Sequence, residues 1–209
     1  MNKDTLKEIW ETVVFVLVAI IIIRFYLGEI RWIPSASMKP TLVEGDRIFV
    51  ERLTRFYDSP KRGDVMVFYP PQVQLNANPF SIFARLTGLF CKDIAYIKRV
   101  IALPGEKIEI VHNEDGSTDV LINDKKLDEP YIMDRFEYPV CTEDMNCGPM
   151  ILGDDEYFMM GDNRGHSADS RYWGVLKKKR FIGRAKLLFW PFTHFKYFEH
   201  KNYDIEEGN

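Results

Sequence analysis

The longest apolar stretch of the chain lies near its N-terminus. Residues 13–23 are all apolar, and residues 25–27 extend this stretch past Arg24. The segment between Glu11 and Gly28 is somewhat shorter than the ~20 residues that usually span a bilayer, but charged groups at its ends can extend to the two interfaces. We therefore predict a single membrane-spanning anchor.

A cleaved signal peptide is the competing interpretation, because an apolar core of this length is typical of that class. Asp4 and Glu8 accompany Lys3 and Lys7 ahead of the core, so this flank is not cleanly positive. The sequence after the core, RFYLG at 24–28, lacks a small-x-small cleavage pattern. Both features favour an anchor that is retained, and the extended pattern that follows disfavours a buried soluble helix.

Beyond the anchor, the hydrophobic pattern is that of β-structure. Short segments rich in β-branched and aromatic residues alternate with turns that contain Gly, Pro, Asn and Asp. The predicted strands lie at 47–52, 64–69, 94–102, 107–112, 157–160 and 181–189. Residues 107–122 predict a hairpin that turns at Asp115-Gly116, and the polar stretch after it predicts an inserted β subdomain over about 107–155.

Two segments stay open between alternatives. In the segment 80–90, Phe80, Phe83, Leu86 and Phe90 recur near helical spacing, which fits either a short amphipathic helix lying on a bilayer or a packed loop. Aromatic residues are frequent but irregularly spaced over 189–198, as expected of either a core strand or a membrane-facing patch.

Composition narrows the function classes. The chain has 209 residues, of which 46% are hydrophobic and 14% aromatic, so it can form a substantial core and is unlike a disordered chain. Its formal net charge of −3 argues against a general nucleic-acid binder, which needs a basic face. We interpret the basic run at 177–180 as a solvated turn or strand end.

The cysteines bear on the compartment. Cys141 and Cys147 lie in a polar, turn-rich stretch, and their spacing allows a small disulfide loop, which requires an oxidising compartment. A pair of free thiols and half of a zinc site are the alternatives. Cys91 is left over, and we interpret it as an unpaired apolar residue.

Common catalytic signatures are missing from the sequence. It contains no HExxH, no GxxxxGK[ST] loop and no GxSxG elbow, and its four histidines are scattered. We therefore predict neither a metal site nor a cofactor.

Three polar segments carry the candidate chemistry. The first, PSASMKPTL at 34–42, places Ser35 and Ser37 two residues apart, so an extended backbone would turn both hydroxyls to the same side. One hydroxyl could attack a carbonyl while the other stabilises the oxyanion. A serine- and proline-rich loop without a catalytic role is the alternative.

The second segment, YIKRVIALPG at 96–105, holds Lys98 and Arg99 inside an otherwise apolar strand. Alternation puts one of these side chains on the core side and the other on the opposite face. A lysine that faces an apolar cleft loses hydration of its charged form, and a fall of ~2–3 units from the usual pKa suits a general base. An edge-strand lysine in water is the alternative.

The third segment, GDNRGHSADSRYWG at 161–174, is dense in polar residues and predicts a tightly hydrogen-bonded loop. Ser167 or Ser170 could supply a hydroxyl that orients a neutral lysine, and Asp169 and Arg171 could form an ion pair. His166 offers a rival base for a Ser-His mechanism.

These segments, together with RGDVMVF at 62–68, resemble in order the motifs of bacterial type I signal peptidases (leader peptidases), which are serine endopeptidases with a Ser-Lys dyad. The resemblance implies that Ser37 is the nucleophile and Lys98 the general base. It implies an oxyanion hole formed by the Ser35 hydroxyl and the Ser37 backbone N–H, and it makes Ser167 the group that orients the lysine.

The resemblance extends to the surroundings of the dyad. Asp169 and Arg171 match a supporting pair near the site. The residues that match the lining of shallow pockets for small substrate residues are Ile33, Pro34, Tyr96 and Ile97.

The resemblance also implies a fold and a substrate. The fold is mainly β, with an N-terminal transmembrane helix followed by an antiparallel β catalytic core that carries the smaller inserted β subdomain. The expected substrates are signal-peptide-bearing preproteins, cleaved after an Ala-x-Ala type site beside the lipid bilayer. Functional association with the secretion translocon fits this role, whereas nucleic acid does not.

The spacing of Cys141 and Cys147 resembles the disulfide of Gram-negative members, which places the expected protein in a bacterial inner (cytoplasmic) membrane. Residues 1–28 would then form a cytoplasmic N-terminus and a single-pass anchor, and residues 29–209 a catalytic domain facing the periplasm. The chain departs from the best-known members in showing one span rather than two, a longer connection at 71–93, and Gly165-His166 in place of a more polar pair. We interpret His166 as a loop residue, because Lys98 already matches the base.

Two other classes of protein share parts of this pattern. A self-cleaving repressor-type peptidase uses a Ser-Lys dyad on a related fold, but it would carry a DNA-binding domain where this chain has its anchor. A non-enzymatic anchored module would have lost Ser37 or Lys98, and both residues are present.

Overall fold

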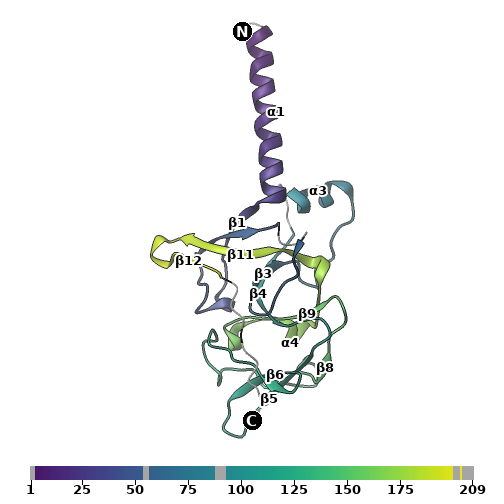
Figure 1. Ribbon diagram of the computed structural model, residues 1–209, viewed down its shortest axis with the longest axis vertical. Helices are drawn as coiled ribbons and strands as arrows, with labels where there is room; N and C mark the ends of the chain where they lie inside the picture. Colours follow the sequence, from purple (N-terminus) through teal and green to yellow (C-terminus); the bar gives the residue numbers. More distant parts are fainter. Residues whose placement is uncertain (1–2, 54–56, 88–92, 200–202, 204–209) are drawn as a thin grey trace.

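A long N-terminal helix stands on a body made of two β-sheets in the computed structural model (Figure 1). The structure describes residues 3–53, 57–87, 93–199 and 203. Helix α1 (Lys3–Tyr26) has 24 residues, none of them buried, and is long and apolar enough to cross a membrane. It exceeds the predicted apolar stretch because the charged residues ahead of residue 13 continue the helix. At 1.5 Å per residue it measures about 36 Å.

The larger sheet is antiparallel and directly follows α1. Its strand order is β1-β2-β11-β3-β4-β9-β10, and β12 pairs with the far end of β11. The strands are β1 (Gly28–Trp32), β2 (Arg47–Glu51), β3 (Val65–Phe68), β4 (Tyr96–Ala102), β9 (Glu156–Met160), β10 (Leu176–Lys177), β11 (Phe181–Trp190) and β12 (Lys196–Tyr197). All the longer predicted strands are confirmed to within a few residues at each end, and the mainly β fold is confirmed with them.

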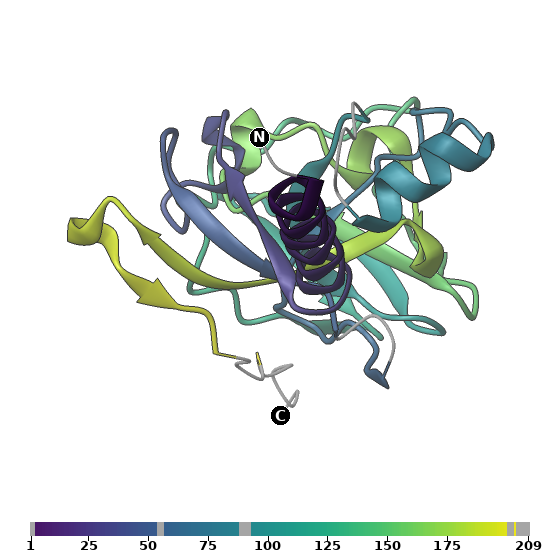
Figure 2. The same cartoon turned by 90° about the horizontal axis from the view of Figure 1, so that it is seen from above.

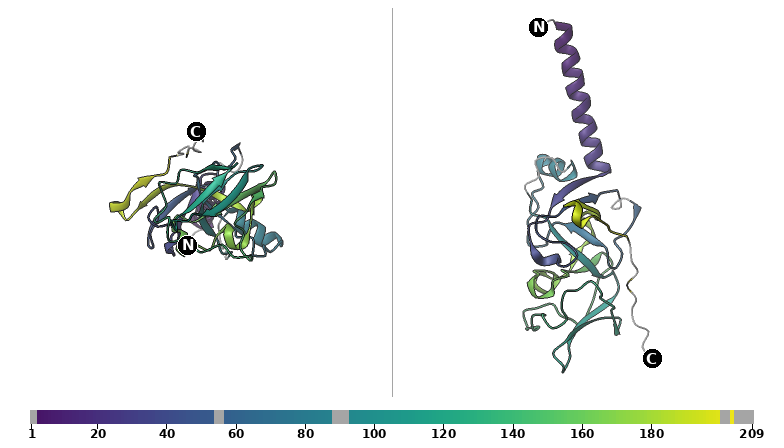
Figure 3. Two further views of the ribbon diagram at one scale, coloured as in Figure 1. Left: turned by 90° about the horizontal axis from the view of Figure 1, so that it is seen from below. Right: turned by 90° about the vertical axis from the view of Figure 1, so that its left-hand side faces the viewer.

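The smaller sheet lies at the end of the body away from α1, as Figure 1 and the right-hand view of Figure 3 show. Its order is β7-β6-β5-β8, formed by β5 (Lys107–His112), β6 (Thr118–Ile122), β7 (Lys125–Lys126) and β8 (Met150–Ile151). Strands β5 and β6 form the predicted hairpin, and Gly116 at its turn has φ +84°, a conformation that favours glycine.

The two sheets share a core through β4 and β9. Ile101 and Phe158 of the larger sheet pack in one apolar cluster with Ile108 and Val120 of the smaller sheet. Two further clusters cover the remaining faces of the larger sheet, so every residue of β4 after Tyr96 is buried. Lys98 and Arg99 of the second motif therefore lie in a central strand that is covered on both faces.

Several short helical turns connect the strands. They are η1 (Ala36–Met38), η2 (Arg164–His166), α4 (Ser170–Trp173), η3 (Lys178–Arg180) and η4 (Phe192–His194). The basic run at 177–180 forms the end of β10 and the turn η3, with Lys177, Lys178 and Lys179 exposed, which confirms its interpretation as a solvated turn.

The two open segments are resolved in different ways. The segment at 80–90 is a helix where it is described, α3 (Pro79–Thr87), and it lies against the lower end of α1 (Figures 1 and 2). In the tail, β11 continues as far as Trp190; beyond it, η4 and β12 project from the body in Figure 2, and Phe192, Phe195 and Tyr197 are exposed.

The disulfide prediction is confirmed, because Cys141 and Cys147 are bonded, with their Cα atoms 6.2 Å apart. This bond removes the free-thiol alternative for the pair. Cys91 lies outside the described residues.

Candidate active site

The two serines of the first motif lie at a tight turn. Ser35 is extended, with φ −139° and ψ 156°, but η1 begins directly after it, and the Lys39 N–H closes the turn on the Ala36 carbonyl at 3.0 Å. The prediction of a continuous extended segment was therefore wrong. The turn nevertheless brings the hydroxyls of Ser35 and Ser37 to 3.3 Å from each other.

Lys98 meets Ser37 inside the protein. The Lys98 Nζ lies 2.7 Å from the Ser37 Oγ, and the two residues are only 4% and 7% exposed. Strand β4 fixes the lysine, because its backbone is paired with Met66 of β3. The predicted pair of a serine and a lysine is thus brought into direct hydrogen-bond contact, whereas the rival base His166 is exposed on η2.

Burial sets the protonation of this lysine. Loss of hydration lowers the pKa of Lys98 from its usual 10.5 to about 8. The carboxylates of Asp169 and Asp162 act in the opposite direction, and the Arg171 guanidinium adds a smaller lowering effect. At pH 7 about one lysine in ten is then neutral, compared with about one in a few thousand at the usual pKa.

Both cations of β4 are buried, one on each face of the strand. The sequence predicted that only one of the Lys98 and Arg99 side chains would face the core. Because apolar clusters cover both faces of β4, Arg99 is buried as well, and its charge needs hydrogen-bond partners inside the protein. Its Nε and Nη2 donate to the two carboxylate oxygens of Asp162 at 2.8 and 2.5 Å, and its guanidinium stacks 4.0 Å from the centre of the Tyr131 ring. Asp162 raises the pKa of Arg99, which stays charged.

Asp162 is a site residue that sequence reasoning missed. The only signal was its position in a loop with many charged residues and glycines, which does not show which cation it meets. In the structure it is fully buried between the two active-site segments, and its field reaches both Arg99 and Lys98.

The third motif is bonded to the serine turn through its backbone. The Asn163 N–H donates to the Ser37 carbonyl at 3.1 Å, and the Asn163 side-chain amide donates to the Ala36 carbonyl at 3.2 Å. Gly161 packs between the Ser37 carbonyl and the side chain of Ser167, where an added Cβ would lie 2.6 Å from the Ser167 Cβ. Glycine is therefore required at position 161, where the backbone passes close to the Ser37 carbonyl and the Ser167 side chain.

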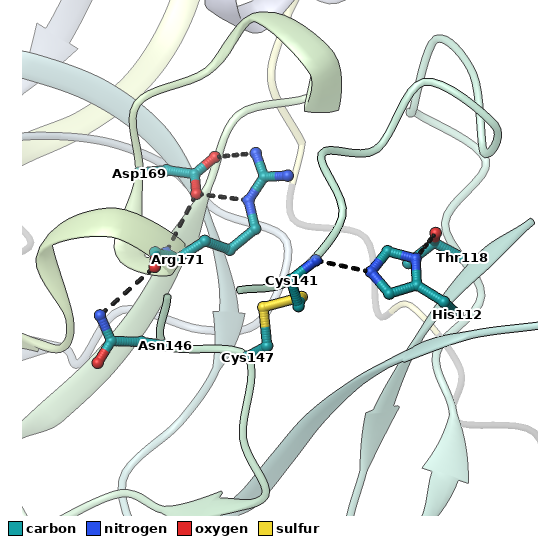
Figure 4. Close-up of a disulfide and its surroundings, with 7 residues drawn as sticks. All are labelled: His112, Thr118, Cys141, Asn146, Cys147, Asp169 and Arg171. Carbon is teal, nitrogen blue, oxygen red and sulfur yellow. Dashed lines mark hydrogen bonds and ion pairs between the residues drawn. A yellow bond between two sulfur atoms is a disulfide. The ribbon is translucent and has the colours of Figure 1, made fainter. Parts of the chain in front are cut away.

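Asp169 and Arg171 form the predicted ion pair. Both are fully buried, and the Arg171 Nε and Nη2 donate to the two carboxylate oxygens at 2.8 Å each (Figure 4). Asp169 also accepts from the Gly161 N–H at 3.1 Å, while Arg171 donates to the Arg164 carbonyl at 2.8 Å. The pair thus fixes the loop that carries Gly161 and Ser167.

The two candidate hydroxyls of this loop have different surroundings. The Ser170 Oγ accepts from the Met159 N–H at 2.9 Å, which ties α4 to β9. The Ser167 Oγ is buried and has no hydrogen-bond partner among the residues that the structure describes. A buried hydroxyl without a partner costs free energy, so of the two serines Ser167 is the one whose hydroxyl is left unsatisfied.

The residues expected to line the substrate pockets differ in burial. Ile33 and Ile97 belong to the same apolar cluster as Met38, which follows Ser37 in the chain. Pro34 is exposed, and the Tyr96 ring lies 5.8 Å from the Lys98 Nζ. A cavity of about 510 Å³ lies elsewhere, on the Arg99 side of β4, where Thr41, Arg99 and Tyr131 line it.

The disulfide loop borders the third motif. The backbone N–H of Asn146 donates to the Arg171 carbonyl at 2.7 Å. Figure 4 shows the second bond to that carbonyl, from the Asn146 side-chain amide at 3.4 Å, and the bond from the Cys141 N–H to the His112 Nε2 at 3.2 Å. Within the described residues, no group of three or more His, Cys, Asp or Glu side chains is placed to hold a metal ion. The chemistry that this arrangement permits is removal of the proton of the Ser37 hydroxyl by the buried amine of Lys98.

Known proteins are similar to this chain in sequence over most of its length. The family model described as signal peptidase, peptidase S26, matches residues 6–190. A probable signal peptidase I-2 from Synechocystis sp. is 36% identical over 191 residues, which cover 90% of this chain and 75% of that protein. Signal peptidase I of Bacillus licheniformis is 31% identical over 199 residues, which cover 93% of this chain and 94% of that protein.

A solved crystal structure of a signal peptidase I from Enterococcus faecalis aligns with a TM-score of 0.40 at 24% identity, over 61% of this chain and 97% of that one. On the strength of the family model and the sequence relatives, the chain belongs to the signal peptidase family, peptidase S26, and is a serine endopeptidase. The resemblance inferred from the four motifs is confirmed. These relatives and the apolar helix α1 also fit a membrane-anchored protein.

Proposed function

We propose that this protein removes signal peptides from exported preproteins, with Ser37 as nucleophile and Lys98 as general base. The observation that carries the proposal is the buried 2.7 Å contact between the Ser37 Oγ and a lysine whose pKa is lowered to about 8. A lysine in this state can accept a proton near neutral pH, which an exposed lysine cannot do at a useful fraction.

The contacts at the dyad support a two-step acyl transfer. Neutral Lys98 takes the proton of the Ser37 hydroxyl as the oxygen bonds to the scissile carbonyl carbon. The carbonyl oxygen becomes an oxyanion, for which the Ser35 hydroxyl and the Ser37 N–H are the proposed donors. As the C–N bond breaks, Lys98 returns the proton to the leaving amine. The lysine then deprotonates a water, which attacks the acyl-serine carbonyl. As the bond to the Ser37 oxygen breaks, Lys98 returns the proton to that oxygen and the signal peptide leaves with a carboxylate end.

Ser167 and the Asp169–Arg171 pair are proposed as the groups that hold Lys98 in place. The buried, unpartnered Ser167 hydroxyl supports this role, because a neutral amine needs a donor or acceptor to fix its lone pair toward Ser37. The ion pair is proposed to act through the loop it fixes rather than by touching substrate.

The proposed cleavage site is of the Ala-x-Ala type, with small substrate residues held beside Ile33, Pro34, Tyr96 and Ile97. The support is the apolar cluster that Ile33 and Ile97 form next to the serine turn. Residues 1–28 are proposed as a cytoplasmic N-terminus and inner-membrane anchor, and residues 29–209 as the periplasmic catalytic domain with its inserted subdomain at about 107–155. The disulfide supports an oxidising compartment for this domain. The translocon is proposed as a functional partner.

The test is processing of a preprotein whose signal ends in Ala-x-Ala by the full-length protein in detergent or vesicles. Ser37→Ala and Lys98→Met are each expected to lower the cleavage rate by about 10³-fold or more. Matched controls are Ser117→Ala in the β5–β6 turn and Lys125→Met on β7, both expected to process the preprotein normally. Normal processing by either dyad variant would overturn the proposal.

A further inference from the structure

Helix α3 presents an apolar face that its own domain leaves uncovered. Phe80 is 64% exposed, and Ile82, Phe83 and Leu86 are each more than 40% exposed. At 100° per residue these four side chains fall on one half of a helix, whereas Ser81 and Arg85 fall on the other half. Aromatic and aliphatic side chains gathered on one side in this way are typical of helices that lie in a membrane interface.

The place of α3 in the fold puts this face beside the anchor. Figure 1 shows α3 at the lower end of α1, on the same side of the body as α1 itself, and in Figure 2 it extends sideways from that end. The two helices are in contact. An apolar face at this height continues the surface that α1 already presents to lipid under the proposed anchor.

Arginine side chains hold α3 in this position. The last carbonyls of a helix lack partners within it, and here Arg24 of α1 donates to the Thr87 carbonyl at 3.2 Å. Arg52 donates to the Arg85 carbonyl at 2.6 Å. Positive charge is favourable at a helix C-terminus, so these contacts both satisfy and stabilise the last turn.

A buried carboxylate organises these arginines. Glu29, 4% exposed, lies 3.6 Å from Arg24, 2.6 Å from Arg31 and 3.6 Å from Arg52, measured between charged atoms. Since Arg24 is in α1 and Glu29 is in β1, this cluster ties the anchor, the larger sheet and α3 to one another. The position of α3 relative to the anchor is therefore fixed by the fold.

The other end of α3 is also set by the local sequence. The Asn78 side chain accepts from the Ser81 N–H at 2.7 Å, which caps the helix N-terminus. Ile82 and Leu86 of α3 also line, together with Lys179, a cavity of about 160 Å³. Lys179 stands on the exposed basic turn η3, so positive charge flanks the apolar face, as suits phospholipid headgroups.

We propose that α3 is a second membrane contact of this protein, lying in the headgroup and upper acyl region of the same bilayer that α1 spans. The inference rests on the membrane anchor of the proposed function. It adds that the catalytic body is held against the bilayer at two points, so its orientation is set by α3 as well as by the anchor. Phe80 and Phe83 are the residues that enter the lipid.

Photocrosslinking of the full-length protein in phospholipid vesicles tests this directly. A benzophenone amino acid is placed singly at Phe83, at Phe80, at Phe15 in α1, or at Ile151 in β8. Ile151 is the matched control, because it is 75% exposed but belongs to the smaller sheet at the far end of the body. Lipid adducts are expected at residues 80, 83 and 15 and not at residue 151.

The possible outcomes of this experiment distinguish the proposed membrane contact of α3 from the proposed membrane anchor α1. Lipid adducts at residue 15 without adducts at 80 and 83 overturn the role of α3 and leave the anchor standing. No lipid adduct at residue 15 overturns the anchor and the α3 contact together. Adducts from 80 and 83 to a second copy of this chain, instead of lipid, also overturn the proposal.

A functional readout completes the test. The double variant F80D/F83D is expected to process a vesicle-embedded preprotein about tenfold more slowly, since a carboxylate resists entry into the bilayer. The same variant is expected to cleave a soluble peptide in detergent at the wild-type rate, because neither residue contacts the dyad. I151D is the control for adding a carboxylate to an exposed apolar position away from α3. Equal loss on both substrates, or no loss on the embedded one, would contradict a role at the membrane.

Discussion

The backbone N–H of Asn163 donates a hydrogen bond to the carbonyl oxygen of Ser37 at 3.1 Å. This contact joins the turn that carries the serine to the loop that carries Gly161, Asp162 and Ser167. The position of the serine is therefore set by a loop distant in sequence as well as by its own turn. Changes in that loop are expected to alter the dyad without touching either of its members.

Gly161→Ala is expected to lower the cleavage rate by about 10²-fold or more, because an added Cβ would meet the Ser37 carbonyl and the Ser167 side chain. Steady-state kinetics on a preprotein measure the effect. Gly153→Ala is the control, since its Cβ would meet only the flexible end of Glu156, at 3.1 Å. If both variants cleave like wild type, the close packing around Gly161 has no bearing on the site.

Ser167→Ala and Ser170→Ala are expected to separate catalysis from stability. The Ser167 hydroxyl has no partner among the described residues, so its removal leaves the melting temperature almost unchanged, while kcat falls about 10–100-fold if it positions Lys98. Ser170→Ala leaves the Met159 N–H unpaired and is expected to cost about 1–3 kcal/mol of unfolding free energy. Thermal unfolding and single-turnover rates distinguish the two, and the reverse pattern would exchange the assigned roles.

The pH dependence of cleavage is expected to follow Lys98. Since its pKa is lowered to about 8, kcat/KM rises with pH below that value, about tenfold per unit, and levels off above it. Rates measured on a substrate without ionisable groups near the cleavage site give the profile. A rise centred near the ordinary lysine value of 10.5, or no rise at all from about two units below the lowered pKa to about one unit above it, would show that Lys98 is not the titrating base.

The same shift predicts a stability difference between wild type and Lys98→Met. Between about pH 8 and 10.5 the unfolded chain keeps a proton on Lys98 that the folded chain has lost, so the stability of wild type rises with pH relative to the variant. The full change is about 3 kcal/mol. Denaturant unfolding at a series of pH values measures it, and groups common to both proteins cancel. A difference that stays flat across this range would mean that the pKa of Lys98 is not lowered.

Loss of the disulfide is expected to reduce stability more than activity. The bond closes a loop with a sequence separation of 6, for which chain entropy gives about 2 kcal/mol. Because the loop contacts Arg171 through Asn146 and does not reach the dyad, a Cys141→Ser/Cys147→Ser variant should keep a cleavage rate within about tenfold of wild type at low temperature. Unfolding curves with and without reductant provide the comparison; a variant as stable as wild type would contradict the estimate.

The sequence predicts the strands well because their hydrophobic and turn residues act locally. It predicts the apolar helix for the same reason. It did not predict that the helix begins as early as Lys3, among charged residues ahead of the apolar stretch. The alternatives for 80–90 and 189–198 stayed open because exposed apolar residues look like buried ones in a sequence. Only tertiary contacts, such as those of Arg24 and Arg52 with the end of α3, decide between them.

The site was predictable as a set of motifs and not as a geometry. Motif order was enough to predict Ser37, Lys98 and the Asp169–Arg171 pair as site residues. It did not predict that Asp162 pairs with Arg99, because several acidic residues in the sequence could have formed that ion pair. The turn at 36–38 could not be foreseen either. Besides its own closing bond, it accepts hydrogen bonds from Asn163, which lies in a segment far along the chain.

The pairing of Lys98 with Met66 across β3 and β4 has one more consequence. Successive side chains of a strand point in opposite directions, so a slip of one residue would present Arg99 to Ser37 instead of Lys98. A guanidinium cannot give up its proton in a protein, whereas an ammonium can. Under the proposed mechanism such a misaligned molecule would carry a positive charge at the same place and be inert, so the alignment of these two strands is a condition for the proposed activation of Ser37.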